Sequence, residues 1–143
     1  MQKTQDELKT KILSVLQNPT MTSFATVKDG KPWVRYVMLH TKDNLDMYFT
    51  TSKKSRKIAQ INQNPNCHIT AGGSPTDFTN PYLQIEGKAE ILEDPSIKKE
   101  FWSDYLGKLF TGPEDPDYVI VHIKPEIIEC WNPDHSNEIY KVS

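Results

Sequence analysis

Cysteine is scarce in this 143-residue chain, which contains only Cys67 and Cys130. The two lie far apart and form no Cys-x-x-Cys spacing, so the pattern indicates neither a zinc site nor a disulfide scaffold. We expect both thiols to be buried and reduced, which is typical of a cytoplasmic protein.

Long hydrophobic runs are also missing. No apolar run approaches the roughly 20 residues that a membrane-spanning helix needs, and the polar residues 1–7 contain no apolar signal-peptide core. The formal net charge is −2, so there is no general excess of positive charge for nucleic acid. We expect neither a membrane nor a nucleic acid as partner, and one domain spanning residues 1–143.

Histidine offers no metal-binding pattern. His40, His68, His122 and His135 are scattered, without a His-x-x-x-His or Glu-x-x-His pair, so the sequence predicts no metal site. No triad of serine, histidine and aspartate can be placed from spacing.

Strand-like segments dominate what is present. Alternating residues of β-branched and aromatic types predict strands at 21–27, 32–40, 45–51, 67–71, 82–92, 118–123 and 127–131, with a short strand at 139–142. Asp29-Gly30 predicts a hairpin between the first two strands. Gly87 predicts a bulge or a close approach by another group, and Lys124-Pro125 separates 118–123 from 127–131.

Apolar stripes predict helices at 4–17, in a segment that ends at Asn64-Pro65, and at 95–108. In the last of these we expect Ile97, Phe101, Trp102 and Tyr105 to face inward. Because the strands mostly follow one another in hairpin order, we predict a mainly β, α+β fold. It would be an antiparallel barrel of six to seven strands with peripheral helices.

The stretch 45–63 combines a strand with a helix whose start is positively charged. Lysine and arginine crowd the first turn, at Lys53, Lys54, Arg56 and Lys57. The N-terminus of a helix is already positive, so this placement is unfavourable unless an anion is bound. Backbone N–H groups and the hydroxyls of Thr50, Thr51 and Ser55 would add donors, so the stretch predicts a phosphate-binding site.

Two plainer interpretations accompany this hypothesis. Lysine-rich turns are usually solvated surface. Arg35 lies in line with the apolar residues Trp33, Val37 and Leu39 of its strand. Its side chain either extends to the edge of the sheet or reaches an anion, and arginine suits bidentate phosphate contacts.

Several stretches in order resemble the pyridoxamine 5′-phosphate oxidase superfamily. They match its R-x-V-x-L strand, its strand followed by S-R-K and a helix ending in N-P, its G-x-A-E strand and its final aromatic-Trp strand. Here these motifs occupy 35–39, 49–65, 86–90 and 129–131. Residues 101–102 and 112–117 are most similar to the general stress protein 26 branch.

The resemblance implies an FMN-binding split barrel, usually a homodimer with FMN at the subunit interface. It implies that Arg35, Ser55, Arg56 and Lys57 bind the FMN phosphate. It also implies that the backbone of Val37 and Met38, together with Phe49 and Thr50, lines the ribityl chain and ring. Tyr82 falls where the family has a glutamine near the ring, and Trp131 would contribute from the partner subunit.

The expected function is an FMN-dependent oxidoreductase acting on a small molecule that the sequence does not name. One alternative is a non-catalytic flavin-binding stress protein, and another is the same barrel binding F420 or haem. The superfamily's true oxidases carry a C-terminal basic segment, whereas residues 132–138 contain no arginine. Pyridoxamine 5′-phosphate oxidase activity itself is therefore not expected.

Overall fold

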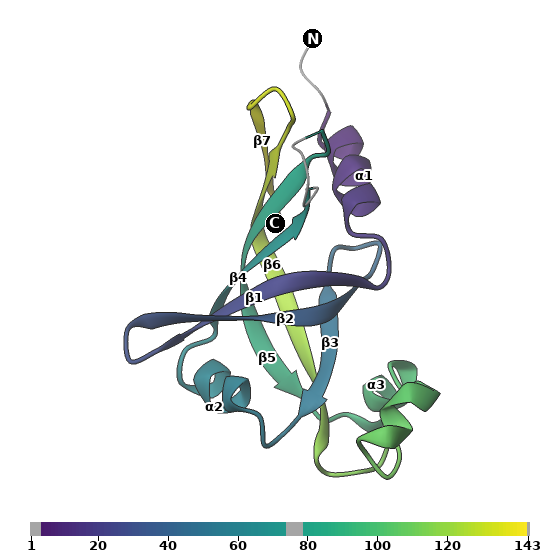
Figure 1. Cartoon of the computed structure of the whole chain (residues 1–143). Helices are drawn as coiled ribbons and strands as arrows, with labels where there is room; N and C mark the ends of the chain where they lie inside the picture. The colour runs from purple at the N-terminus through teal and green to yellow at the C-terminus, as the bar shows by residue number, and fades with distance from the viewer. Residues whose placement is uncertain (1–3, 74–78, 143) are drawn as a thin grey trace.

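The computed structural model describes residues 4–73 and 79–142, which form a sheet closed into a barrel with helices outside it (Figure 1). The helical elements are α1 (Gln5–Val15), α2 (Arg56–Gln63), α3 (Pro95–Glu100) and the 3₁₀ helix η1 (Asp104–Lys108). The strands are β1 (Thr20–Lys28), β2 (Lys31–Thr41), β3 (Met47–Ser52), β4 (Asn66–Gly72), β5 (Tyr82–Leu92), β6 (Tyr118–Trp131) and β7 (Asn137–Lys141).

The strands run in the order β3-β2-β1-β4-β5-β6-β7, and pairing of β3 with β6 closes the barrel. Every pairing is antiparallel, and β7 is an additional strand on the edge of β6. The predicted fold class is therefore confirmed. The β1–β2 turn has positive φ at both Asp29 (52°) and Gly30 (73°), as a two-residue hairpin of this handedness requires.

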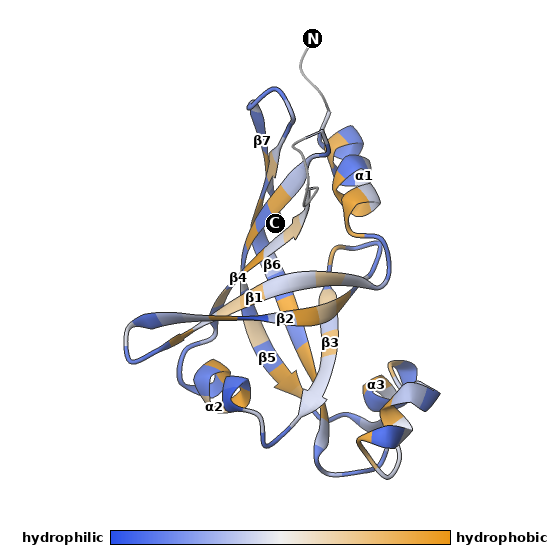
Figure 2. Ribbon diagram, in the orientation of Figure 1, coloured by the Kyte–Doolittle hydropathy of each residue, from blue (hydrophilic) through white to orange (hydrophobic). Residues whose placement is uncertain are grey.

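Buried apolar residues of β1–β6 fill the barrel interior together with residues of α1. Apolar and polar positions alternate along the strands in the ribbon coloured by hydropathy (Figure 2). Leu8 and Ile12 of α1, followed by Leu16, pack into it. Thr4 caps this helix by accepting a hydrogen bond from the Glu7 N–H at 3.1 Å. A second apolar cluster lies outside the barrel, where residues of α3 and η1 pack against Tyr118 and Ile120 of β6. Among the described residues, no helix is long and apolar enough to cross a membrane.

Two details of the predicted secondary structure are wrong. The strand expected to break at Lys124-Pro125 is continuous, because Pro125 lies opposite Gly87 where the β5–β6 register shifts. At such an irregularity the missing N–H of proline costs no regular ladder bond. The helix expected over 95–108 is interrupted between α3 and η1, and Tyr105 is 67% exposed, whereas Leu106 is buried in its place.

The tight approach at Gly87 provides a prediction about stability. A Cβ at this position would lie 2.6 Å from the Lys124 carbonyl oxygen and 3.1 Å from the Pro125 Cα, both backbone atoms of β6. Gly87→Ala is therefore expected to lower the free energy of unfolding by about 1–3 kcal/mol, measured by urea denaturation. Gly107→Ala is the control, because no atom lies within 4 Å of its added Cβ. An equal loss in both variants would contradict this explanation.

Candidate functional site

The strands β2 and β3 separate along most of their length, which leaves a gap in the barrel wall. They pair only at His40–Tyr48 and Thr41–Met47. Beyond these pairs β2 stays with β1, and β3 stays with β6 as far as Ser52. In the described part of the chain, no strand therefore pairs with the facing edges of β2 and β3 beyond these two residue pairs.

The start of α2 lies beside this gap and brings positive side chains to it. Ser55 precedes the helix in an extended conformation, and its side chain does not cap the helix. Its hydroxyl instead accepts a hydrogen bond from Lys57 Nζ at 3.3 Å, and Thr51 Oγ1 accepts another at 3.0 Å. The first turn contains no acidic residue, so no side chain within it offsets the partial positive charge of its free N–H groups.

Arg35 enters the same site from β2 and is held by internal acceptors. Its Nη1 donates to Thr26 Oγ1 and its Nη2 donates to Gln60 Oε1, each at 2.8 Å. Gln60 lies on the buried face of α2 between Ile58 and Ile61. A polar residue on the buried face of a helix is a signal for such a positioning role, but Gln60 was not among the residues predicted from the sequence.

We call Arg35, Arg56 and Lys57 the cation cluster. Burial lowers the pKa of Arg35, and the neighbouring Arg56 lowers it further. Burial also lowers the pKa of Lys57, with Arg35 as a second cause. In the described ranges, no carboxylate forms an ion pair with any of the three. The charges therefore repel one another, and a bound anion would relieve that repulsion.

Lys53 and Lys54 do not belong to this cluster, which corrects the expectation that they crowd the first turn. Both precede α2, which begins at Arg56. The Lys53 ammonium pairs with Glu93 at 3.0 Å, and the Lys54 ammonium pairs with Asp117 at 3.3 Å. These lysines are neutralised within the chain.

The remaining expected residues divide between the gap and the core. Met38 is 45% exposed, whereas Thr50 and Thr51 are partly buried and line a groove beside the gap. The side chains of Val37 and Phe49 are 8% and 1% exposed and pack in the core. These two residues can offer a ligand only their backbone groups.

Tyr82 and Trp131 lie far from the cation cluster in the same chain. Their rings are nearly parallel, with centroids 6.5 Å apart, and Trp131 Nε1 donates a hydrogen bond to Gln84 Oε1 at 3.1 Å. Along β6, Trp131 is ten residues from Val121, the partner of Phe49. At about 3.3 Å per residue this separation is roughly 30 Å. One chain therefore does not bring the two groups of predicted residues together.

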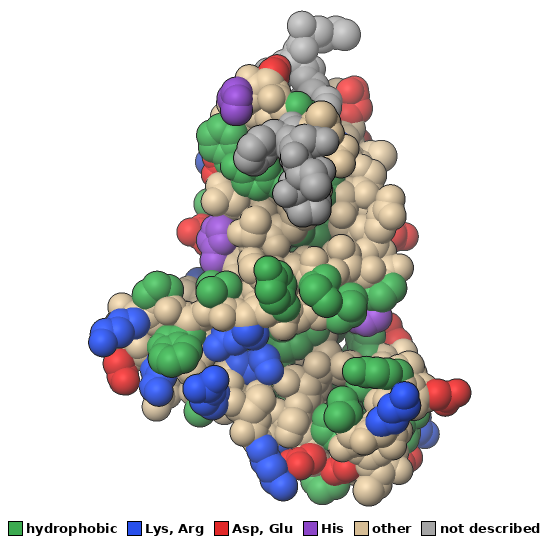
Figure 3. Space-filling model, in the orientation of Figure 1, with side chains coloured by type: hydrophobic (Ala, Val, Ile, Leu, Met, Phe, Trp, Pro, Cys, Tyr) green, Lys and Arg blue, Asp and Glu red, His purple; other side chains and the backbone are tan. Residues whose placement is uncertain are grey.

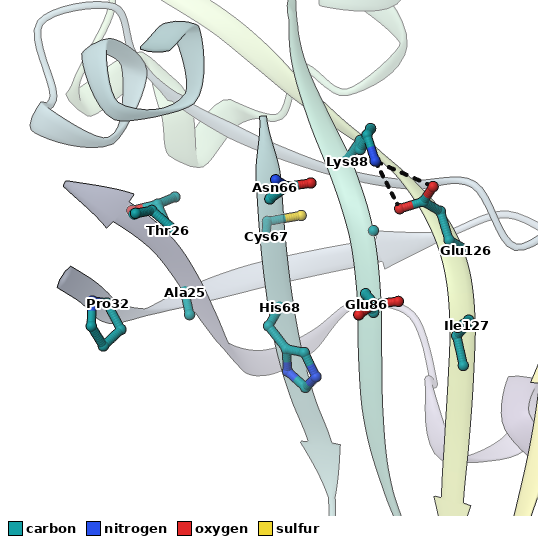
Figure 4. Close-up of a pocket in the computed structure, with 12 residues that line it drawn as sticks. Ala25, Thr26, Pro32, Asn66, Cys67, His68, Glu86, Lys88, Glu126 and Ile127 are labelled. Carbon is teal, nitrogen blue, oxygen red and sulfur yellow. Dashed lines mark hydrogen bonds and ion pairs between the residues drawn. The ribbon is translucent and has the colours of Figure 1, made fainter. Parts of the chain in front are cut away.

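A hollow of about 650 Å³ elsewhere on the surface lacks the features of an anion site (Figure 4). It is lined by residues of β1, β4, β5 and β6, including His68 and Glu86. Its one lysine, Lys88, is paired with Glu126 at 3.2 Å. This hollow therefore offers no unneutralised cation, unlike the gap beside α2.

Comparison with known proteins agrees with this geometry. A family model described as "Pyridoxamine 5′-phosphate oxidase" matches residues 8–132. This chain belongs to the pyridoxamine 5′-phosphate oxidase family. It is 40% identical to General stress protein 26 of Bacillus subtilis over 128 residues, which are 90% of this chain and 91% of that protein.

Solved structures of similar proteins have the same fold. The crystal structure of General Stress Protein 26 from Bacillus anthracis superposes with a TM-score of 0.81 at 32% identity, covering 94% of this chain and 98% of that one. A structure named F420 reductase has a TM-score of 0.61 at 28% identity, covering 80% of this chain and 93% of that one. A heme binding protein from Mycobacterium smegmatis has a TM-score of 0.75 at 11% identity. The superposition covers 99% of this chain and 60% of that protein's chain, and at this identity it shows a shared fold alone.

The longer oxidases of the family match only in part. The pyridoxine/pyridoxamine 5′-phosphate oxidase of Escherichia fergusonii is 35% identical over 89 residues. Those residues are 62% of this chain, and they span only 39% of the oxidase.

Proposed function

We propose that this protein binds FMN, with the phosphate at the cation cluster, and acts as an FMN-dependent oxidoreductase on a small molecule. The observation that carries the proposal is the proximity of Arg35, Arg56 and Lys57 at the start of α2, where none of the three forms an ion pair with a carboxylate of the described residues. The hydroxyls of Thr51 and Ser55 both accept hydrogen bonds from Lys57 Nζ, so they lie beside the same cation. A phosphate dianion suits this combination of charge and donors.

The other expected residues have roles consistent with the same ligand. Backbone groups of Val37, Met38 and Phe49 border the gap, and Thr50 adds a hydroxyl beside it. Bound flavin would supply the redox chemistry, and the protein would hold and tune it.

We also propose that the protein is a homodimer and that Tyr82 and Trp131 of the partner subunit complete each site. Within one chain these residues lie too far from the cluster. Apolar side chains lie exposed on the outer face of β1 and β2 (Figure 3), namely Met21, Val34, Tyr36 and Met38 at 61%, 67%, 77% and 45% exposure. An exposed apolar area of this kind favours a protein interface, here with a second copy.

Comparing FMN with riboflavin tests the phosphate site directly. The purified protein is titrated with each compound, and binding is followed by flavin fluorescence. Riboflavin lacks the phosphate and is expected to bind at least about 100-fold more weakly, because each charge-assisted hydrogen bond contributes about 1.5–3 kcal/mol. Equal affinities, or no binding of FMN, would overturn the assignment.

Two further measurements separate the alternatives. Parallel titration with F420 and with haem tests the other cofactors, and tighter binding of either would replace FMN in the proposal. The F420 arm is included because of the 28% identical F420 reductase. Anaerobic reduction of the FMN-loaded protein by NADH or NADPH, followed by turnover with an electron acceptor, distinguishes an oxidoreductase from a flavin-binding stress protein.

A further inference from the structure

The guanidinium of Arg35 is held only by neutral acceptors in the described residues. Its Nη1 donates to the Thr26 hydroxyl at 2.8 Å and to the carbonyl oxygens of Phe24 and Trp33, each at 3.2 Å. Its Nη2 donates to Gln60 Oε1 at 2.8 Å. These dipoles offset part of the cost of removing the guanidinium from water, but they leave its positive charge unneutralised.

Gln60 is at the centre of this support, because its Oε1 accepts two hydrogen bonds. The second comes from the Thr26 hydroxyl at 2.5 Å, and the two residues are 5% and 1% exposed. Gln60 belongs to α2, which also carries Arg56 and Lys57. Lysine and arginine side chains gather over β2 and α2 in Figure 3. One helix therefore supplies two members of the cation cluster and the group that positions the third.

The same contacts leave one edge of the Arg35 guanidinium free. A guanidinium has five N–H donors. In the described part of the chain, Arg35 donates from Nη1 and once from Nη2, so Nε–H and the second N–H of Nη2 have no acceptor there. Such a pair of N–H groups suits two oxygens of one phosphate. Gln60 and Thr26 thus hold one side of the guanidinium and leave the other side to a ligand.

The charge of the side chain at position 60 matters more than its size. Glutamine and glutamate are nearly equal in size, and a carboxylate here would bind Arg35 more strongly than the amide does. That carboxylate would also cancel the charge that attracts an anion. A neutral amide therefore favours ligand binding over the stability of the empty protein.

We propose that Gln60 is a positioning residue whose neutral amide keeps the charge of Arg35 available to the ligand, and that it thereby sets the preference for a phosphorylated flavin over an unphosphorylated one. The proposal rests on the phosphate site of the proposed function. Gln60 acts through Arg35 and not through the ligand. Structural damage at the site would weaken the binding of both flavins, whereas loss of the free charge would weaken the binding of FMN alone.

Gln60→Glu is the direct test, with FMN and riboflavin each titrated and followed by flavin fluorescence. The dissociation constant of FMN is expected to rise at least about tenfold, the scale of one charge-assisted hydrogen bond, while that of riboflavin stays within about threefold. Gln63→Glu makes the same change at an exposed position of α2, and both constants are expected to stay within about threefold. Unchanged FMN affinity in Gln60→Glu, equal losses for both flavins, or an equal FMN loss in Gln63→Glu would overturn the proposal.

Gln60→Met separates the charge from the lost acceptor. It removes the acceptor of Arg35 without adding a competing charge, so FMN is expected to bind about threefold to tenfold more weakly, a smaller loss than in Gln60→Glu. A loss as large as that in Gln60→Glu would contradict the role given to charge. Should Gln60→Glu not fold, unchanged FMN affinity in Gln60→Met would overturn the positioning role.

Inorganic phosphate, added to the protein without flavin, distinguishes this proposal from the one on which it rests. It is expected to raise the midpoint of thermal unfolding more in the wild type and in Gln63→Glu than in Gln60→Glu, because a ligand stabilises only the protein that binds it. General salt effects would raise all three midpoints alike, and such an equal rise would refute the role of Gln60. Failure of the wild type to bind FMN, with the phosphate difference intact, would be failure of the proposed function alone.

Discussion

The double variant Arg56→Ala/Lys57→Ala is expected to bind FMN at least about 100-fold more weakly than the wild type, a loss of about 3 kcal/mol or more. The two substitutions remove two of the three members of the cation cluster, none of which forms an ion pair in the described chain, and they leave Arg35 held by Thr26 and Gln60. The measurement is a fluorescence titration with FMN. Without FMN, the variant is expected to be no less stable than the wild type, since the cluster is self-repelling.

The chain provides a control with the same change in net charge. Lys53→Ala/Lys54→Ala removes two lysines from the adjoining turn, and both pair with carboxylates, Glu93 and Asp117. This control is expected to change FMN affinity by no more than about threefold, because exposed pairs contribute little. Equal losses in the two double variants would show that bulk charge, not a defined phosphate site, holds the ligand.

Phe24→Ala is expected to have the largest effect on stability, lowering the free energy of unfolding by about 3–5 kcal/mol. The Phe24 ring is fully buried and meets the Phe49 ring edge-on, with the two ring centroids 4.9 Å apart. The Arg35 guanidinium lies 5.9 Å from its centroid, so the cavity would also loosen the support of the cation cluster. Urea denaturation of the protein without FMN measures the loss.

Tyr105→Ala is the matched aromatic control for this experiment. Its ring is 67% exposed, so its removal is expected to change stability by no more than about 0.5 kcal/mol. A loss for Tyr105→Ala as large as that for Phe24→Ala would show that burial does not account for the difference.

Local residue patterns predicted most of the barrel. Alternation located the strands, and Asp29-Gly30 located the hairpin, because their side chains and backbone preferences act within a few residues. Pro125 was misleading because its tolerance depends on Gly87 across the sheet, a partner that no local pattern reveals. Tyr105 was placed inward because a continuous helical period was assumed through a segment that changes to a 3₁₀ helix.

The same distinction applies to the site. Helix polarity and residue type singled out Arg56, Lys57 and Ser55, and the strand pattern singled out Arg35. Ion pairs with residues distant in the sequence excluded some lysines from the cation cluster. Lys53, for example, forms an ion pair with Glu93, forty residues later in the chain. The distance between the cation cluster and the Tyr82–Trp131 stack also became visible only once the register of β6 was known.

The separation of β2 from β3 bears on how this architecture acquires new ligands in evolution. On the side away from the opening, β2 pairs with β1 and β3 pairs with β6. The opening therefore does not interrupt these strand pairings. Its borders come from a helix start and from an inserted segment, neither of which holds the barrel closed. Residues at this opening can therefore change without disturbing the strand pairing, which would let related proteins with this fold bind different ligands.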